Sequence, residues 1–323
     1  MKQIQSGRQE GNSGKIKNYM KKLTVLVTIL VVLLVFMMVS FSSAKGSIQL
    51  ISPLSKGEKV LGINQWFPGD VDGVDTGAPQ VTAEVSLFIE TNSGDVLFAK
   101  NPKRKLPIAS LVKVMTVLVA LEHKNMDDKF VVSQGAADME PDKMLLVAGE
   151  KLTLRELLDG IFLISANDGA EVIAEGTTGD RQEFIKLMND KAKQLGMKDT
   201  YFANPTGLDE DSGSSYSTAY DMVILTRYLI RRYPEVVEIS STEHIYLPQT
   251  EDHQDYDMYS GINLLTTYPG VVGFKTGYTP EAGLTLITLA RKNGHEVIGI
   301  LLGSGSRRDE ARELLDYSFR KLQ

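Results

Sequence analysis

A run of 19 residues without a charged side chain, Leu23–Phe41, divides this chain of 323 residues into two very unequal parts. The run is rich in valine, leucine and isoleucine, and a helix of about 20 apolar residues is long enough to cross a bilayer. Residues 1–22 carry six basic side chains and one acidic side chain. Because basic flanks stay on the cytoplasmic side of a membrane, we expect residues 1–22 to form a cytoplasmic tail and the rest to be exported.

Two interpretations of this apolar run remain open. A transmembrane anchor would make the protein a single-pass protein of the cell membrane with an extracytoplasmic body. A signal peptide would be cleaved near Ser42-Ser43-Ala44, where the side chains are small, and the protein would then be secreted. The apolar region of a signal peptide is usually about 7–15 residues long, so the length of this run favours the anchor.

The remainder of the chain is acidic, because the net charge of the whole is −6 although residues 1–22 are basic. Nucleic-acid binding needs a basic surface, so we expect no nucleic-acid partner. The absence of cysteine excludes thiol catalysis, disulfides and cysteine metal sites. The histidines lack metal-binding spacing, so we expect no metal or other cofactor, and a Ser-His-Asp triad stays only formally possible because no G-x-S-x-G motif is present. They are His123, His244, His253 and His295.

The pattern after the apolar run predicts a linker followed by one folded domain. Residues 42–80 contain glycine, proline, serine and aspartate with little periodicity, which is typical of a linker, and the domain is expected at 81–323. Asn293-Gly294 between two apolar runs is a strong hairpin signal. Strands are expected at 85–89, 96–99, 284–289 and 297–302, with a further strand-rich stretch from 270 to 279. Helices are expected at 110–122, 154–162, 169–175, 180–195, 219–232 and 307–322, with Thr153 and Glu156 as the capping box of the second.

Ser110 and Lys113 lie at the start of an apolar, helix-compatible segment that follows Pro107. If a helix begins at Ser110, the two side chains share one face and lie within hydrogen-bonding reach. A serine hydroxyl is a weak nucleophile, and a lysine held out of water or beside another cation can lose its proton and act as its base. The helix N-terminus would also present backbone N–H groups to an oxyanion. A four-residue pattern recurs by chance, however, and a lysine one turn into a helix is usually a solvated surface charge.

Two further motifs follow in the chain. Ser165-x-Asn167 is expected in a tight connection between two apolar helices, where both side chains can point into a cleft, although a polar turn capped by Asn167 would have the same pattern. Lys275-Thr276-Gly277 is expected on an edge strand. Each motif alone is weak evidence. The three in this order, at separations of 55 and 110 residues, predict that distant segments meet at one site.

The ordered trio resembles the signature set of β-lactamases and penicillin-binding proteins. Further stretches between about residue 81 and residue 323 resemble the low-molecular-mass D-alanyl-D-alanine carboxypeptidases of peptidase family S11, which trim peptidoglycan stem peptides. The resemblance implies an α/β (α+β) fold of the β-lactamase/transpeptidase type. Such a fold has an antiparallel sheet flanked by helices, a helical subdomain and an active site between them. The stretches are 165–170 (SANDGA), 204–208 (NPTGL), 217–221 (STAYD), 274–279 (FKTGYT), 282–283 (AG) and 314–317 (LLDY).

This resemblance implies a catalytic role for five side chains. Ser110 would attack the carbonyl of the penultimate D-alanine, Lys113 would take its proton, and Ser165 would relay a proton to the leaving amine. Asn167 would hold the substrate amide. Lys275 would supply positive charge that keeps Lys113 neutral and attracts the terminal carboxylate. Water would then hydrolyse the acyl-enzyme on Ser110.

The same resemblance implies how the end of the substrate is held. Thr276 would hydrogen-bond the terminal carboxylate, and Arg307 would reach it too, with Arg308 as an adjacent alternative. The oxyanion hole would be formed by the backbone N–H groups of Ser110 and of Tyr278, the residue after the Lys-Thr-Gly motif that ends in Gly277.

The expected partners follow from these roles. They are peptidoglycan stem peptides that end in D-Ala-D-Ala, and β-lactam antibiotics, because penicillins resemble the D-Ala-D-Ala end and should acylate Ser110 and stay bound. The cytoplasmic membrane is an expected partner through Leu23–Phe41.

Two alternatives belong to other functional classes. A class A-like β-lactamase needs a carboxylate that activates the deacylating water, usually in a Glu-x-x-x-Asn stretch, and Glu183 instead has Leu187 four positions on. A non-catalytic homologue that binds the cell wall could keep the fold. The intact motifs argue against this second alternative, because a binding protein has no need of Lys113.

Overall fold

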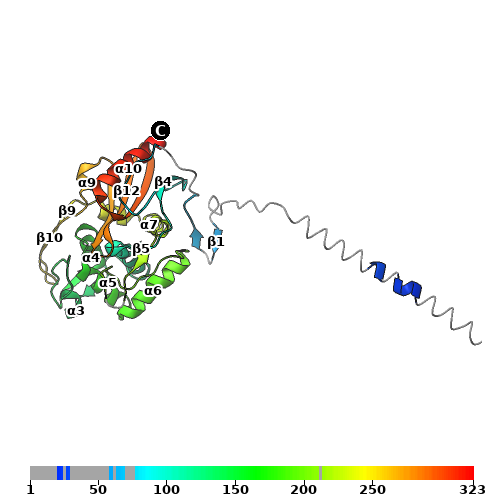
Figure 1. Ribbon diagram of the computed structural model, residues 1–323. Helices are drawn as coiled ribbons and strands as arrows, with labels where there is room; N and C mark the ends of the chain where they lie inside the picture. The colour runs from blue at the N-terminus through cyan, green and yellow to red at the C-terminus, as the bar shows by residue number, and fades with distance from the viewer. Residues whose placement is uncertain (1–19, 25–26, 30–57, 61–62, 70–76, 211–212) are drawn as a thin grey trace, which may run out of the picture. The chain divides into compact units, whose positions relative to one another are not determined.

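The computed structural model describes residues 20–24, 27–29, 58–60, 63–69, 77–210 and 213–323 (Figure 1). Most of the apolar run Leu23–Phe41 lies outside these residues. No helix within the described residues is both long enough and apolar enough to span a bilayer. The chain divides into the units Met1–Ile51 and Ser52–Gln323, and the fold below is that of the second unit.

A five-stranded antiparallel sheet forms one layer of this unit (Figure 1). The strand order is β11-β12-β13-β3-β4, which places β11 at one edge. The turn between β12 and β13 contains Asn293 and Gly294 at φ values of 53° and 80°, which confirms the predicted Asn-Gly hairpin. The strands are β3 (Val85–Glu90), β4 (Val96–Lys100), β11 (Val271–Thr279), β12 (Gly283–Lys292) and β13 (His295–Ser304).

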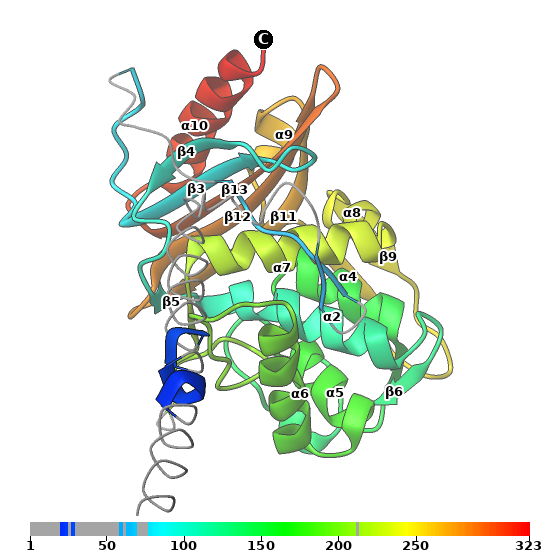
Figure 2. The same ribbon diagram turned by 90° about the vertical axis from the view of Figure 1, so that its right-hand side faces the viewer.

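The two faces of the sheet pack against different helices, because alternate residues of a strand point to opposite sides. Leu87 of β3 belongs to a large core shared with most of the helices, whereas Phe88 belongs to a smaller core shared with α10 (Arg307–Lys321). The helix α7 (Ala219–Arg232) contacts β3 and β13 from the side opposite to α10, as Figure 2 shows. The predicted flanking of an antiparallel sheet by helices is therefore confirmed.

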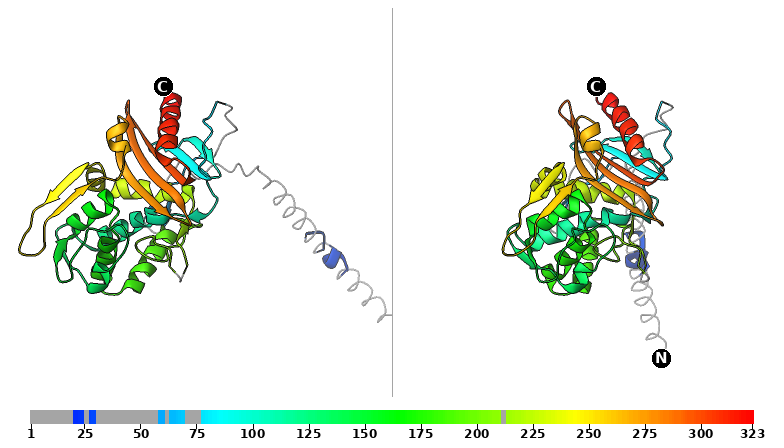
Figure 3. Two further views of the ribbon diagram at one scale, coloured as in Figure 1. Left: turned by 60° about the vertical axis from the view of Figure 1, so that its left-hand side comes forward. Right: turned by 90° about the vertical axis from the view of Figure 1, so that its left-hand side faces the viewer.

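A group of helices forms the second layer of the unit, on the side of α7 (Figure 3). Residues 113–121 of α2 are all buried, because this helix is surrounded by contacts to α5, α6 and α7. The helix α4 begins with the predicted capping box, in which Thr153 and Glu156 exchange side-chain and backbone hydrogen bonds. The helices are α2 (Lys113–His123), α4 (Leu154–Leu163), α5 (Asn167–Thr178) and α6 (Arg181–Gln194), and the 3₁₀ turn η1 (Ala109–Val112) precedes α2.

Short strands and helices complete the folded unit. The strands β9 and β10 pair as a small antiparallel hairpin. Within the segment predicted as a linker, the Trp66 ring lies 4.2 Å from the guanidinium carbon of Arg227 on α7, so this part packs on the folded unit. The smaller strands are β1 (Glu58–Val60), β2 (Ile63–Gln65), β5 (Leu106–Pro107), β6 (Lys129–Val131), β7 (Lys151–Thr153), β8 (Tyr216–Ser217), β9 (His244–Leu247) and β10 (Tyr256–Tyr259). The short helices are α3 (Gln134–Ala137), α8 (Glu235–Ser240) and α9 (Leu264–Thr267).

Candidate active site

Ser110 lies in η1, where the helical layer meets the edge strand β11. It was predicted to open a regular helix, but α2 begins only at Lys113, because Ala109 has a left-handed φ of 48° and the turn that follows is 3₁₀. A non-glycine residue in this region is strained, and such strain is concentrated at functional sites. A Cβ atom on Gly277 of β11 would lie 2.8 Å from the Ser110 backbone nitrogen, so only glycine allows the strand to come this close.

Lys113 is fully buried and makes three hydrogen bonds. Its Nζ lies 2.8 Å from Ser110 Oγ, 2.7 Å from Asn167 Oδ1 and 2.7 Å from the Thr206 carbonyl oxygen. The Asn167 amide nitrogen donates to the Pro141 carbonyl, which turns its oxygen toward the lysine. Two of the three partners can only accept, so a neutral amine would give them its two N–H groups and turn its lone pair to the Ser110 hydroxyl.

Burial lowers the pKa of Lys113 to about 7, because water no longer stabilises its charged form. The negative charges of Asp142, Glu171 and Asp168 oppose this effect and raise the pKa. A lysine with a pKa near neutrality can exchange a proton in both directions at physiological pH, which is what a general base that later returns its proton requires.

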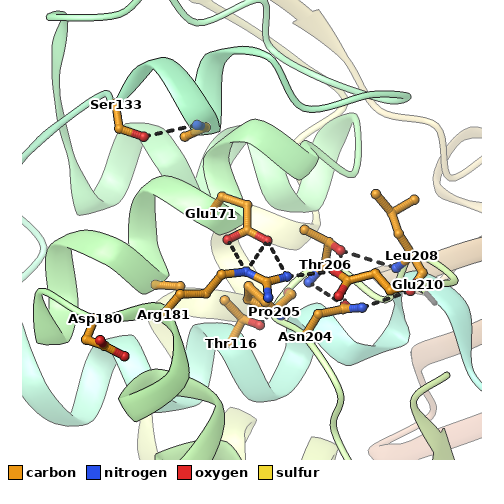
Figure 4. Close-up of polar contacts among 12 residues, drawn as sticks. Thr116, Ser133, Glu171, Asp180, Arg181, Asn204, Pro205, Thr206, Leu208 and Glu210 are labelled. Carbon is orange, nitrogen blue, oxygen red and sulfur yellow. Dashed lines mark hydrogen bonds and ion pairs between the residues drawn. The ribbon is translucent and has the colours of Figure 1, made fainter. Parts of the chain in front are cut away.

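The Thr206 carbonyl is fixed by the turn 204–208, which sequence reasoning noted only as a family-like stretch (Figure 4). Asn204 Oδ1 accepts from the backbone N–H groups of Thr206 at 3.2 Å and Gly207 at 2.6 Å, and Asn204 Nδ2 donates to the Leu208 carbonyl at 2.8 Å. Gly207 has a φ of +84°, and a Cβ atom there would lie 2.0 Å from the Ala109 oxygen. The turn therefore packs closely against η1 and places the Thr206 carbonyl oxygen within hydrogen-bonding distance of Lys113.

A buried carboxylate of α5 lies behind this turn and has no signal in the sequence (Figure 4). Glu171 receives hydrogen bonds from Arg181 Nε at 3.0 and 3.2 Å, and Arg181 Nη2 continues to Glu210 at 2.7 Å. Burial raises the pKa of Glu171, and the hydrogen bond from Arg181 opposes that rise. The charge of Glu171 is one of those that favour the protonated form of Lys113, so this ion-pair network acts on the base from a distance.

A second lysine approaches from the sheet. Lys275 of β11 is almost fully buried, and its Nζ donates to Ser165 Oγ at 2.8 Å and to the Thr276 carbonyl at 2.7 Å. Ser165 lies between α4 and α5 with a left-handed φ of 64°. Burial lowers the pKa of Lys275 well below its ordinary value, and the charges of Lys113 and Arg307 lower it further. The two buried lysines therefore compete for positive charge, whereas the sequence prediction placed that charge on Lys275 alone.

The two arginines that the sequence left as alternatives lie in different surroundings. Arg307 Nη1 donates to the Gly277 carbonyl at 2.7 Å and to the Thr285 carbonyl at 3.3 Å, so its guanidinium is held against β11. Arg308 is exposed and pairs with its neighbour Asp309 at 2.9 Å. Geometry therefore associates Arg307 with the strand of the Lys-Thr-Gly motif, while both arginines border one cavity beside it.

The remaining predicted positions lie on the same strand. Thr276 is half-buried, and the Tyr278 side chain is exposed. The backbone of β11 touches the backbone of Ser110 at Gly277, so the two N–H groups predicted to form an oxyanion hole belong to touching segments. In the described part of the chain, no group of three or more metal-binding side chains is present.

Three distant motifs are thus brought together at the junction of the two layers. Ser110, Lys113 and Asn167 form one hydrogen-bonded group, and Ser165 and Lys275 form another. What sequence reasoning missed is the acceptor at Thr206, which is a backbone atom, and the acidic side chains that act on Lys113 without touching it.

Comparison with known proteins gives matches over most of the described unit. The sequence pattern of the D-alanyl-D-alanine carboxypeptidase family, peptidase S11, matches residues 72–306. The D-alanyl-D-alanine carboxypeptidase DacF of Bacillus subtilis is 37% identical over 256 residues, which cover 77% of this chain and 65% of DacF. DacB2 of Mycobacterium tuberculosis is 30% identical over 261 residues, which cover 79% of this chain and 88% of DacB2.

Solved structures give the same picture. The DD-transpeptidase of Streptomyces K15 is similar with a TM-score of 0.71 and 26% identity, over 76% of this chain and 100% of that chain. Penicillin-binding protein D2 of Listeria monocytogenes, solved with cefotaxime bound, is similar with a TM-score of 0.64 and 30% identity, over 76% of this chain and 100% of that chain. The similar proteins thus include D-alanyl-D-alanine carboxypeptidases, a DD-transpeptidase and a penicillin-binding protein solved with cefotaxime bound.

Proposed function

Because this chain belongs to the D-alanyl-D-alanine carboxypeptidase family, peptidase S11, we propose that it removes the terminal D-alanine from peptidoglycan stem peptides by serine catalysis. The single observation that carries the proposal is the contact of a fully buried lysine amine with the Ser110 hydroxyl at 2.8 Å. A base in this position activates a nucleophile, and a binding protein gains nothing from the cost of burying it.

The first half of the reaction forms the acyl-enzyme. Lys113 takes the Ser110 proton while Ser110 Oγ bonds to the carbonyl carbon of the penultimate D-alanine. The backbone N–H groups of Ser110 and Tyr278 stabilise the negative oxygen that results. The carbon–nitrogen bond then breaks, and the proton held by Lys113 passes through the Ser165 hydroxyl to the leaving nitrogen as D-alanine departs. Lys113 is neutral again after this step.

Binding of the substrate itself sets the charges of the two lysines in this proposal. The terminal carboxylate would lie against Thr276 and Arg307, close to Lys275. A carboxylate there raises the pKa of Lys275, and a charged Lys275 favours the neutral form of Lys113. In this proposal, Lys113 is most often neutral, and so able to act as a base, when a peptide with a free C-terminal carboxylate is bound.

The second half returns the enzyme to its starting state. A water molecule gives a proton to Lys113 and attacks the ester carbon, and Ser110 leaves with the proton back on its oxygen. Asn167 holds the amide of the acyl group in place during both halves. A β-lactam follows the first half only, because the ring-opened product stays attached to Ser110.

We also propose where this reaction takes place. The 81–323 domain acts outside the cytoplasm on the cell wall, and Leu23–Phe41 anchors it to the cytoplasmic membrane with residues 1–22 as a cytoplasmic tail and 42–80 as a linker. The charge pattern of the N-terminal region supports this arrangement. Protease digestion of intact cells tests the arrangement, because only the domain, and not an N-terminal tag, should be cleaved.

The activity is tested with the full-length protein in mild detergent and diacetyl-L-Lys-D-Ala-D-Ala. Mass spectrometry should detect loss of one D-alanine with the wild type and none with Ser110→Ala. Ser86→Ala is the matched control, because Ser86 is buried on β3, its hydroxyl has no hydrogen-bond partner among the described residues, and the variant should behave as wild type. Failure of the wild type to release D-alanine or to be labelled by a fluorescent penicillin would favour the alternative of a non-catalytic homologue that binds the cell wall.

A β-lactamase remains the second candidate, and the hydrogen bonds of two buried carboxylates weigh against it. Asp168 is used by the backbone N–H groups of Met144 and Leu146, and Glu171 is used by Arg181, so neither carboxylate is available to activate a deacylating water. Nitrocefin should therefore give a stoichiometric burst. Continued rapid turnover would favour the β-lactamase.

A further inference from the structure

A cavity of about 50 Å³ lies beside the candidate site, between α9, β12 and the beginning of α10. Thr276 and Arg307 border it at the Lys-Thr-Gly strand, and its apolar lining includes Ile262, Leu264 and Leu286. Ser110, Lys113 and Ser165 are not among its lining residues. The cavity therefore begins at the positions proposed for the terminal carboxylate and extends away from the nucleophile.

This position determines which part of a substrate can enter. In an amino acid, the side chain and the carboxylate are attached to the same Cα atom. A C-terminal residue held by Thr276 and Arg307 through its carboxylate therefore has its side chain within one or two bonds of the cavity. The methyl group of D-alanine is the smallest side chain that a D-residue can present there, and it leaves most of the space unused.

The volume and the lining define the side chain that fits. A water molecule needs about 10–15 Å³ of such a cavity, so about 50 Å³ holds several water-sized groups, which is close to a branched four-carbon side chain. The lining side chains Ile262, Leu264 and Leu286 are hydrocarbons that belong to the small core between the sheet and α10. Asn263, Thr276, Arg307 and Arg308 also line the cavity, but its exposed surface is almost entirely apolar. Hydrocarbon side chains therefore gain from entering such a space, whereas polar ones lose hydration.

We propose that this cavity is a specificity site for the side chain of the C-terminal D-residue, and that the protein releases medium-sized apolar D-amino acids such as D-leucine as well as D-alanine. The inference rests on the proposed carboxypeptidase function and deepens it. The covalent steps are unchanged. The bond that breaks is the amide between the penultimate D-alanine and D-leucine, whose nitrogen leaves with a proton, and water completes the hydrolysis.

The first experiment compares three substrates with the full-length wild type. They are diacetyl-L-Lys-D-Ala-D-X peptides in which X is alanine, leucine or asparagine, and the released amino acid is quantified by mass spectrometry. Leucine and asparagine have similar shapes, so their comparison isolates the polarity of the cavity. We expect kcat/KM for D-leucine to lie above or within about tenfold of that for D-alanine, and at least about tenfold above that for D-asparagine.

The second experiment fills the cavity. Gly261 borders it, has no left-handed φ, and a Cβ atom there would meet nothing closer than the Leu163 carbonyl at 3.7 Å. Gly261→Leu can therefore be accommodated and should lower the ratio of D-leucine to D-alanine release by about 100-fold. Gly135→Leu on α3 is the matched control, because Gly135 is exposed, remote and equally open, with its nearest atom at 3.8 Å. It should leave the ratio unchanged.

The outcomes separate this inference from the function on which it rests. If the wild type releases no D-alanine, the proposed function fails first. Release of D-alanine with D-leucine more than about tenfold slower overturns the specificity site alone. Equal release of D-asparagine and D-leucine, or an unchanged ratio in a folded Gly261→Leu variant, also overturns it. The substrate comparison needs no variant, so the inference stays testable even if Gly261→Leu does not fold.

Discussion

The helical side and the sheet side of the candidate site are built in contrasting ways. On the helical side, Lys113 makes hydrogen bonds to Ser110, Asn167 and Thr206, and the turn that carries Thr206 is itself closed by the Asn204 side chain. On the sheet side, the Lys-Thr-Gly strand borders a cavity. The first arrangement fixes a proton-transfer geometry, and the second leaves room for different substrates. We expect changes on the helical side to lower kcat and changes on the sheet side to alter binding and selectivity.

The largest effect is expected from Lys113→Met, which keeps the length of the side chain and removes the base. The rate of Ser110 acylation by a fluorescent penicillin should fall by about 10³–10⁴-fold, because general-base catalysis contributes that much. Stopped-flow labelling measures this rate. Lys191→Met is the control, because Lys191 is also mostly buried but pairs with Glu122 far from the nucleophile. Acylation of the Lys113→Met variant at the wild-type rate would contradict the role of Lys113 as the base that activates Ser110.

On the sheet side, Arg307→Gln should affect recognition of the carboxylate more than chemistry. Charge-assisted hydrogen bonds contribute about 1.5–3 kcal/mol, so kcat/KM for the D-Ala-D-Ala peptide should fall by about 10–100-fold, mainly through KM. For a peptide with a C-terminal amide, the same variant should show little change in kcat/KM. The measurement is therefore the ratio of kcat/KM for the free-acid peptide to kcat/KM for the amide peptide. Arg308→Gln is the matched control, because Arg308 is exposed and its guanidinium pairs with the neighbouring Asp309 rather than with β11. Equal losses in the two arginine variants would contradict the assignment.

The turn beneath the base gives a smaller, mixed effect. Asn204→Ala leaves buried donors of Thr206 and Gly207 without their acceptor, which should lower the free energy of unfolding by about 3 kcal/mol. The misplaced Thr206 carbonyl should also lower kcat by about tenfold, since small displacements at a reacting centre are costly. Urea denaturation and single-turnover kinetics measure the two quantities separately.

Asn189→Ala separates these two effects. Asn189 also bonds backbone groups, at Ile185 and Phe202, but it lies away from Lys113. It should lower stability and leave the kcat of the folded protein unchanged. If both asparagine variants lose stability alone, the turn supports the fold and does not position the base.

The elements that could be predicted from sequence are those specified by local chemistry. Asn293-Gly294 folds as the expected hairpin because both residues tolerate positive φ, and Thr153 with Glu156 forms the expected capping box. The meeting of Ser110, Lys113 and Lys275 near one junction was predictable only because three motifs occur in a known order. The roles of these residues stay predictions until the variants are measured.

Other features of the site depend on packing that no local pattern specifies. The Thr206 acceptor is a backbone atom, and any residue type supplies one. The ion pairs of Arg181 join Glu171 and Glu210 from separate segments without a recurring spacing. The cavity exists because α9 packs beside β11 and leaves space between side chains, which the sequence of either element alone does not reveal.

The pH dependence of acylation tests which of the two buried lysines, Lys113 on the helical side or Lys275 on the sheet side, controls the rate. Its expected effects are the smallest of those predicted. Burial lowers the pKa of Lys113 to about 7, and only the neutral amine is a base. The acylation rate of the wild type should therefore rise with pH through this region, as the fraction of neutral Lys113 increases. A pH–rate profile of penicillin labelling between pH 5 and 9 measures it.

Asp142 offers a way to move this profile without touching the base. It is exposed, and its charge raises the pKa of both Lys113 and Lys275. Asp142→Asn removes that charge, so the protonated form of Lys113 becomes less favourable and the profile should shift to lower pH. Because solvent screens an exposed charge, the gain in acylation rate at pH 6 should be only about two- to threefold. Asp138→Asn, on the same segment, should change nothing. A fall in the acylation rate at pH 6 would mean that the rate follows the charge on Lys275, whose pKa the substitution also lowers, and that the sheet side rather than the helical side controls the proton.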